Sequence, residues 1–113
     1  MKPTDQLYRG SLTTILLKLF ADHKELYGYE ITQKVKALSE NALSLTEGAL
    51  YPALHKLEAD GLLSSVIRQV DNRPRKYYAL TKKGRKTSAL KLEEFAGYLQ
   101  AMLGLLSLKK QTS

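Results

Sequence analysis

Cationic and aromatic side chains gather in one quarter of this 113-residue chain. Between Ser65 and Lys91 there are nine lysine and arginine residues and a single acidic residue, Asp71. The rest of the chain carries nine basic and ten acidic residues, so this segment holds the whole basic excess behind the net charge of +7. Cations interleaved with the rings of Tyr77 and Tyr78 are typical of a surface that binds a polyanion, nucleic acid above all. Charge alone is equally consistent with a solvated basic face that aids solubility.

Residue patterns that would indicate catalysis or metal binding are not found in the sequence. The two histidines, His23 and His55, fall in different predicted elements, and there is no cysteine. The adjacent carboxylates of Glu93 and Glu94 diverge on a helix, and the sequence has no glycine-rich phosphate loop. We therefore expect no enzyme, metal or cofactor. The lack of cysteine favours the reducing cytoplasm. The longest nearly apolar stretch, residues 95–108, is too short to span a bilayer, so we expect no membrane partner.

Three helices are predicted before the basic segment, because apolar residues recur at helical spacing. The predicted helices cover residues 7–21, 28–37 and 46–60, with a connection at 23–27 and a polar turn at 39–45. Thr46 is the expected N-cap of the third helix, and Gly61 is its expected C-terminal stop. Pro52 conflicts with this helix, because it lacks an amide hydrogen and crowds the carbonyl group four residues back. We therefore expect the third helix to start late or to be kinked.

A β-hairpin and a long helix are predicted to follow. Residues 62–70 and 75–80 are rich in β-branched and aromatic side chains, and they flank the turn-forming segment 71–74. Thr81 is the expected N-cap of a last helix that runs to about Leu108. The order helix, helix, helix, hairpin, helix is that of a winged helix-turn-helix, a mainly α fold with a small β-hairpin. In this interpretation, residues 1–80 form the winged helix-turn-helix domain, which binds DNA, and residues 81–113 form a dimerisation helix and tail.

The last predicted helix is apolar around most of its circumference. Glu93, Gly97, Gln100, Gly104 and Ser107 share one narrow face of polar or small residues. A helix that covers a single core needs an apolar arc of about 100°, and this arc is roughly twice as wide. A second copy of the chain is the economical partner for the uncovered side. The two glycines either face solvent or let two helices approach closely. The residues expected at the dimer interface are Leu92, Phe95, Ala96, Leu99, Met102, Leu103 and Leu106.

Three strings in the sequence resemble the PadR family of bacterial and archaeal transcriptional regulators. They are YGYEI at residues 27–31, TEGALYPALHKLEADGLL at 46–63 and PRKYYALTKKGR at 74–85. The resemblance implies a homodimeric repressor that binds an inverted-repeat operator in double-stranded DNA, with the C-terminal helix as the dimer contact. A single helix after the wing is similar to the short branch of the family. Some relatives hold planar hydrophobic effectors between aromatic side chains at the dimer centre, and here Phe95 and Tyr98 would form that pocket.

The residues expected to contact DNA lie on the third helix, on the wing and at the start of the second helix. They are Tyr29, Thr46, Glu47, Gly48, Ala49, Tyr51, His55, Lys56, Arg68, Arg73, Arg75 and Lys76. The small Gly48 and Ala49 let the helix backbone approach the major groove, whereas Tyr51 either touches DNA or packs under the wing. Tyr29 either hydrogen-bonds the backbone at the start of the second helix or wedges the first two helices together. The alternative function is a protein-interaction adaptor on a winged-helix fold that has lost DNA binding.

Overall fold

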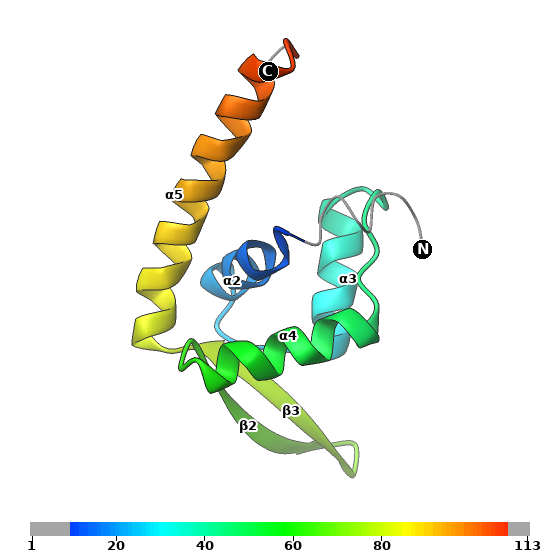
Figure 1. The fold of residues 1–113 in the computed structure, drawn as a ribbon. Helices are drawn as coiled ribbons and strands as arrows, with labels where there is room; N and C mark the ends of the chain where they lie inside the picture. The colour runs from blue at the N-terminus through cyan, green and yellow to red at the C-terminus, as the bar shows by residue number, and fades with distance from the viewer. Residues whose placement is uncertain (1–9, 109–113) are drawn as a thin grey trace.

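The computed structural model describes residues 10–108, which form four helices and a small antiparallel sheet (Figure 1). In chain order the elements are α2 (Leu12–Asp22), β1 (Leu26–Tyr27), α3 (Gly28–Leu38), α4 (Glu47–Ala59), β2 (Leu63–Val70), β3 (Arg73–Leu80) and α5 (Lys82–Leu105). The predicted mainly α class and the predicted order of helices and hairpin are confirmed. Strand β1 was not predicted, because two residues are too few to show an alternating pattern. Residues 7–9 of the first predicted helix lie outside the described residues.

The sheet is a hairpin with one short extra strand. Its strand order is β1-β3-β2, all antiparallel, with Tyr27 opposite Tyr77 and Ser65 opposite Tyr78. The hairpin turn is shorter than the predicted loop, since only Asp71 and Asn72 lie between the strands. Both residues have positive φ angles, 52° and 61°, which is the backbone of a two-residue turn whose twist matches that of the strands.

A single hydrophobic core fills the space between the helices and the sheet. Its largest fully buried side chains are Tyr78, Phe20, Leu16, Leu17, Leu26, Ile31, Leu50 and Leu54. These residues come from α2, β1, α3, α4 and β3, so every one of these elements is fixed to the same core. The burial leaves one face of α4 and most of the wing outside the core.

Helix α4 begins at Glu47, and the predicted late start is wrong. The hydroxyl oxygen of Thr46 accepts a hydrogen bond from the amide of Ala49 at 3.2 Å, as expected of an N-cap. Pro52 is the sixth residue of the helix, so its missing amide affects only the carbonyl of Gly48, while buried Leu50 anchors the first turn. The helix ends at Ala59, and Gly61, two residues later, has a φ angle of 77°, as predicted for the residue that stops the helix.

The first two turns of α5 are locked onto the domain. The hydroxyl of Thr81 accepts a hydrogen bond from the amide of Gly84 at 3.0 Å and donates one to the carbonyl of Gly61 at 2.6 Å. Gly84 lies so close to the connection between α4 and β2 that a Cβ atom there would stand 2.1 Å from the carbonyl oxygen of Leu62. One turn later, the buried hydroxyl of Ser88 donates to the carbonyl of Leu17, on α2, at 3.2 Å.

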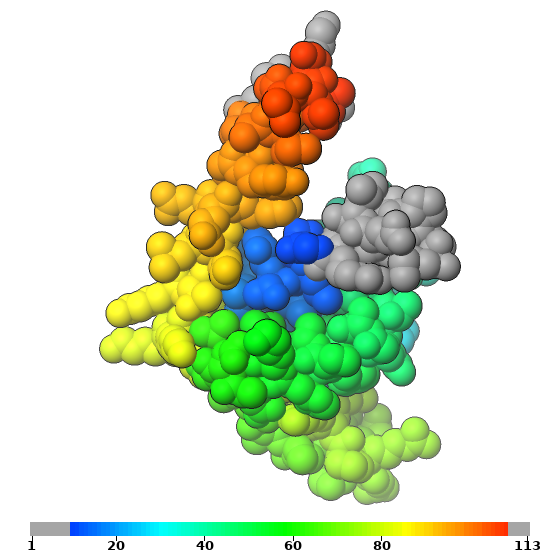
Figure 2. Space-filling view, in the orientation of Figure 1, coloured from blue at the N-terminus to red at the C-terminus, as the bar shows by residue number. Residues whose placement is uncertain are grey.

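Beyond these turns α5 projects from the domain (Figures 1 and 2). The helix ends at Leu105 rather than at about Leu108. The described part of the chain is elongated as a result, with principal extents of 53 × 30 × 26 Å. No helix within residues 10–108 is both long enough and apolar enough to cross a membrane.

Candidate nucleic-acid interface

Helix α4 presents one face to the core and the opposite face to solvent. Its buried stripe consists of Leu50, Leu54 and Leu57. The exposed residues include all those predicted to read DNA from this helix, namely Glu47, Gly48, Ala49, Tyr51, His55 and Lys56. A Cβ atom added at Gly48 would have nothing within 4 Å, so the protein itself leaves the space over the first turn empty. The exposed first turn can therefore approach a flat or grooved partner closely.

Tyr51 joins α4 to the start of α3. Its ring packs over Gly28, where a Cβ atom would lie 2.4 Å from the tyrosine oxygen. The side chain is nevertheless 38% exposed, so it is available at the surface while it fixes the angle between the two helices. Any larger residue at position 28 would require the Tyr51 ring to move.

At the start of α3, a glutamate side chain, not a tyrosine, hydrogen-bonds the backbone. The carboxylate of Glu30 accepts a hydrogen bond from the backbone amide of Tyr27 at 3.1 Å. Tyr29 is 64% exposed and projects into solvent beside this turn. Tyr27 packs edge-on against Tyr77 of the wing, with 5.4 Å between the ring centroids.

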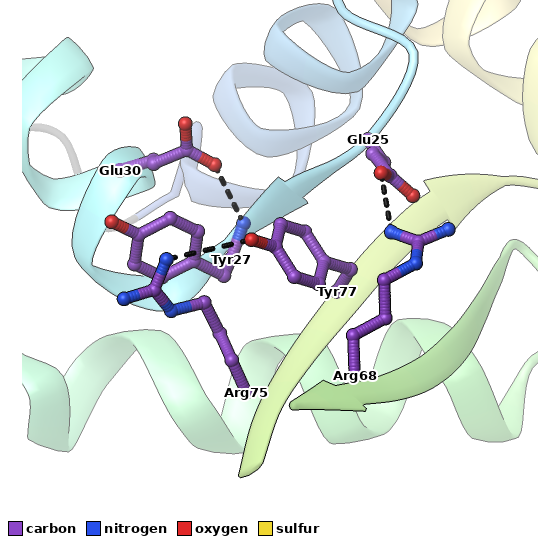
Figure 3. A network of polar contacts seen from close by, with 6 residues as sticks. All are labelled: Glu25, Tyr27, Glu30, Arg68, Arg75 and Tyr77. Atoms are coloured by element: carbon purple, nitrogen blue, oxygen red, sulfur yellow. Dashed lines mark hydrogen bonds and ion pairs between the residues drawn. The ribbon is translucent and has the colours of Figure 1, made fainter. Parts of the chain in front are cut away.

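Two arginines on one face of the wing are stacked on tyrosine rings (Figure 3). Arg68 and Arg75 lie opposite each other in the β2–β3 register, and their side chains share a face with Tyr77. The guanidinium of Arg75 lies 4.1 Å from the centroid of the Tyr27 ring, and that of Arg68 lies 5.1 Å from the centroid of Tyr77. Arg68 also forms an ion pair with Glu25. Both arginines are therefore held in place, with their outer edges in solvent.

The other face of the wing is bonded to α4. Lys76 lies 3.5 Å from the carboxylate of Glu58, which also accepts a hydrogen bond from the hydroxyl of Ser65. The hydrogen bond from Ser65 lowers the pKa of Glu58, partial burial opposes this, and the ammonium of Lys76 lowers the pKa further, so that the net shift is downward. Arg73, at the tip of the hairpin, is exposed, and its side chain makes no hydrogen bond or ion pair within residues 10–108.

Helix α4, the wing and the start of α3 meet around one groove of about 290 Å³. Its lining residues are Tyr27, Gly28, Tyr51, His55, Pro74, Arg75, Lys76 and Tyr78. The structure thus brings Tyr51 and His55, predicted on the third helix, next to two of the predicted wing cations. Lys56 lies further along α4, where it pairs with Asp60 at 3.4 Å.

The free half of α5 carries a second surface, made of apolar side chains. Of the residues predicted at the dimer interface, Leu92, Ala96, Leu99 and Leu106 are exposed, while Phe95, Met102 and Leu103 are half-buried. The rings of Phe95 and Tyr98 lie 6.0 Å apart and border a hollow of about 440 Å³ between α5 and the start of α2. A patch of exposed leucines of this kind is unusual on the surface of a monomeric protein.

Comparison with known proteins decides the family. Residues 16–90 match the model of the PadR-like transcriptional regulators. The chain belongs to this PadR-like family. A transcriptional regulator of Mycobacterium tuberculosis, Rv3488, is 41% identical over 80 residues, which cover 71% of each chain. The predicted resemblance is confirmed, and the chain is a transcriptional regulator.

Solved structures of PadR-like regulators have the same fold. A transcriptional regulator from Clostridium thermocellum superposes with a TM-score of 0.78 at 29% identity, and the match covers 86% of this chain and 94% of that one. A PadR family regulator from Eggerthella lenta gives a TM-score of 0.76 at 26% identity, over 94% and 90% of the two chains. The family match spans α3, α4 and the wing, the elements that build the surface described above.

Sequence reasoning missed the two glutamates that hold wing cations. Glu58 lies inside the PadR-like string, and its position at the end of a helix just before a basic hairpin was a usable signal. Glu25 is separated from Arg68 by 43 residues, and nothing in the local sequence connects the two. The contact depends on strand β1, which carries the chain past the wing.

Proposed function

We propose that this PadR-like regulator binds double-stranded DNA as a homodimer and represses transcription from an inverted-repeat operator. The observation that carries the proposal is the exposed face of α4 beside a cationic wing. A helix of this kind enters the major groove with its N-terminal residues, and a basic hairpin binds the adjacent phosphates. A repressor of transcription works where the chromosome lies, which in bacteria and archaea is the cytoplasm.

Each part of the surface has a distinct role in this proposal. Gly48 and Ala49 allow the first turn of α4 to approach base edges, and the carboxylate of Glu47 can accept a hydrogen bond from a cytosine amino group. Thr46, which uses its hydroxyl as the helix cap, sets the start of that turn. The other proposed contacts are Tyr29, Tyr51, His55, Lys56, Arg68, Arg73 and Arg75, whereas Lys76, which the sequence also predicted to contact DNA, is paired with Glu58 instead. Of the three wing arginines, Arg73 is the one whose side chain makes no hydrogen bond or ion pair within residues 10–108, so it can reach the duplex without losing a described contact.

The apolar face of α5 supports the homodimer. Its exposed leucines have no partner on the described part of the same chain that would cover them, and a second α5 offers a self-complementary surface. A two-fold dimer places two α4 helices on adjacent major grooves of one duplex face, about 34 Å apart or a multiple of that distance. The symmetry of the protein then requires an inverted repeat in the DNA.

A small hydrophobic effector would bind next to Phe95 and Tyr98. The hollow beside these rings lies between α5 and α2, so an occupant would touch both the dimer contact and the DNA-binding domain. Such a ligand changes DNA affinity only if it binds one arrangement of the two α4 helices more tightly than another.

Salt dependence of DNA binding tests the proposal. A duplex selected by the protein from a random-sequence pool, and an unselected duplex of equal length, are titrated by fluorescence anisotropy at several salt concentrations. With about eight phosphates bound per dimer, the logarithm of affinity should fall with the logarithm of salt at a slope near −7. The variant Arg73→Ala should flatten the slope, whereas Lys18→Ala, on α2, should not. Binding that ignores salt, or no preference between the duplexes, would favour the adaptor.

A further inference from the structure

The carboxylate of Glu58 connects α4 to both strands of the wing. Glu58 lies in the last turn of α4, and its two oxygens contact different strands. One oxygen accepts the hydrogen bond from Ser65 on β2, and the other lies 3.5 Å from the ammonium of Lys76 on β3. Ser65 and Lys76 project from the same face of the hairpin, since Ser65 is opposite Tyr78 and Lys76 is opposite Ile67. The contact is therefore a clamp between two elements that both belong to the proposed DNA surface.

The contact with Glu58 also neutralises the charge of Lys76 within the protein. Its ammonium lies 5.2 Å from the ring centroid of Tyr78 as well as beside Glu58. Partial burial lowers the pKa of Lys76, but Tyr78 and Glu58 together outweigh this and raise it. Both members of the pair are charged at neutral pH, and they neutralise each other. Their side chains remain 33% and 40% exposed, so a loss of Glu58 would release Lys76 into solvent.

We propose that Glu58 is a positioning residue for DNA binding, which fixes the wing against the end of α4 and keeps Lys76 off the phosphates. The inference rests on the proposed function and adds a source of sequence preference to it. Binding to unselected DNA grows with the number of available cations. When Lys76 is paired with Glu58, the wing has one fewer cation to bind phosphate, so the protein binds unselected DNA less tightly. The fixed wing also keeps the geometry that binding to a correct DNA site requires.

The variant Glu58→Gln tests this role, because glutamine keeps the shape and the acceptor for Ser65 but loses the charge. We expect a larger affinity for an unselected duplex, a steeper salt dependence and a smaller preference for the selected duplex. One released cation per subunit makes the slope more negative by about 0.9 each, or about 1.8 per dimer. A fourfold rise in salt then lowers affinity about twelvefold more than for the parent protein.

Two further variants separate this role from simpler explanations. Asp22→Asn removes an acid from an exposed pair with Lys18, on α2, and should leave both slope and preference unchanged. Lys76→Gln alone should leave the slope of the parent, and Glu58→Gln combined with it should no longer steepen the slope. Circular dichroism and thermal unfolding verify that each variant is folded.

The results that would overturn the inference are specific. If Lys76→Gln alone flattens the slope by about 0.9 per subunit, Lys76 already binds phosphate in the parent protein. If Asp22→Asn and Glu58→Gln change binding equally, net charge explains the effect and Glu58 has no positioning role. A parent protein that prefers no duplex removes the proposed function itself, and that result is seen before any variant is measured.

Discussion

Gly48 offers a substitution whose effects on stability and on DNA binding should have opposite signs. It is the second residue of α4, it is exposed, and a Cβ atom there would meet nothing within 4 Å. The variant Gly48→Ala adds one methyl group to the part of the helix that is proposed to lie deepest in the major groove. The folded protein has room for this methyl group, whereas the bound duplex would not.

The expected magnitudes follow from these surroundings. Alanine in a helix is more stable than glycine by about 0.5–1 kcal/mol, and the lower figure applies near a helix start. The midpoint of thermal unfolding should therefore rise by about 2–4 °C. Losing the contacts to one base pair costs about 1–3 kcal/mol, so affinity for the selected duplex should fall roughly five- to 150-fold.

Two assays on the same preparation measure the two effects. Calorimetry gives the unfolding midpoint, and anisotropy titration gives affinities for the selected and the unselected duplex. Gly97→Ala is the matched control, because position 97 is also helical, exposed and without a neighbour within 4 Å. It should be stabilised like Gly48→Ala but keep the affinity of the parent, and sedimentation at the assay concentration shows whether it remains dimeric.

Two outcomes would refute the reasoning. A Gly48→Ala protein that is more stable and binds the selected duplex unchanged would mean that the first turn of α4 does not approach the DNA. A protein that is less stable than the parent would mean that the space over Gly48 is filled in solution. In either case the placement of α4 in the major groove would have to be abandoned.

Three other predictions concern the dimer, the contact between α5 and the rest of the domain, and the pH dependence of stability. Leu99 is 47% exposed, and a carboxylate at this position would be poorly accommodated in an apolar interface. The variant Leu99→Glu should therefore sediment as a folded monomer and bind DNA at least about tenfold more weakly. An intact dimer would contradict this prediction. Gly84→Ala should lower the free energy of unfolding by about 1–3 kcal/mol in urea titrations, because its methyl group would overlap the Leu62 carbonyl. The pKa of Glu58 is lowered below its ordinary value of 4.5, so its stabilising effect is present above that pH and disappears as pH falls through the lowered pKa. The stability advantage of the parent over Glu58→Gln should therefore shrink as pH falls below 4.5 and through the lowered pKa, and a difference that does not change with pH would refute the assigned cause.

The helices and the hairpin were predictable because their boundaries are marked by local chemistry. Thr46 and Thr81 cap their helices through contacts three residues ahead, and Gly61 ends α4 with the left-handed backbone that glycine favours. The effect of Pro52 was misjudged, because burial of the same turn outweighs one missing hydrogen bond. The turn was predicted too long, since Arg73 continues the ladder by pairing with Val70.

The candidate site was predictable as a set of residues but not as a set of contacts. The wing cations share one segment of sequence, which suggests equivalent roles. In the structure Arg68 pairs with Glu25, Lys76 pairs with Glu58 and Arg73 is unpaired within residues 10–108. These differences arise from β1 and from the packing of α4 on the hairpin, both of which bring together residues far apart in the chain.

The close approach of Gly84 to the carbonyl of Leu62 fixes the start of α5 rigidly to the rest of the domain. In the proposed dimer, the distance between the two α4 helices would be set by where the two α5 helices cross, and moving that crossing by one helical turn would shift it by about 5.4 Å along α5. Exchanging a few leucines in the outer half of α5 can retune that distance while every base-reading residue stays the same. Under the proposed function, the spacing and the sequence of the operator could therefore change independently of each other.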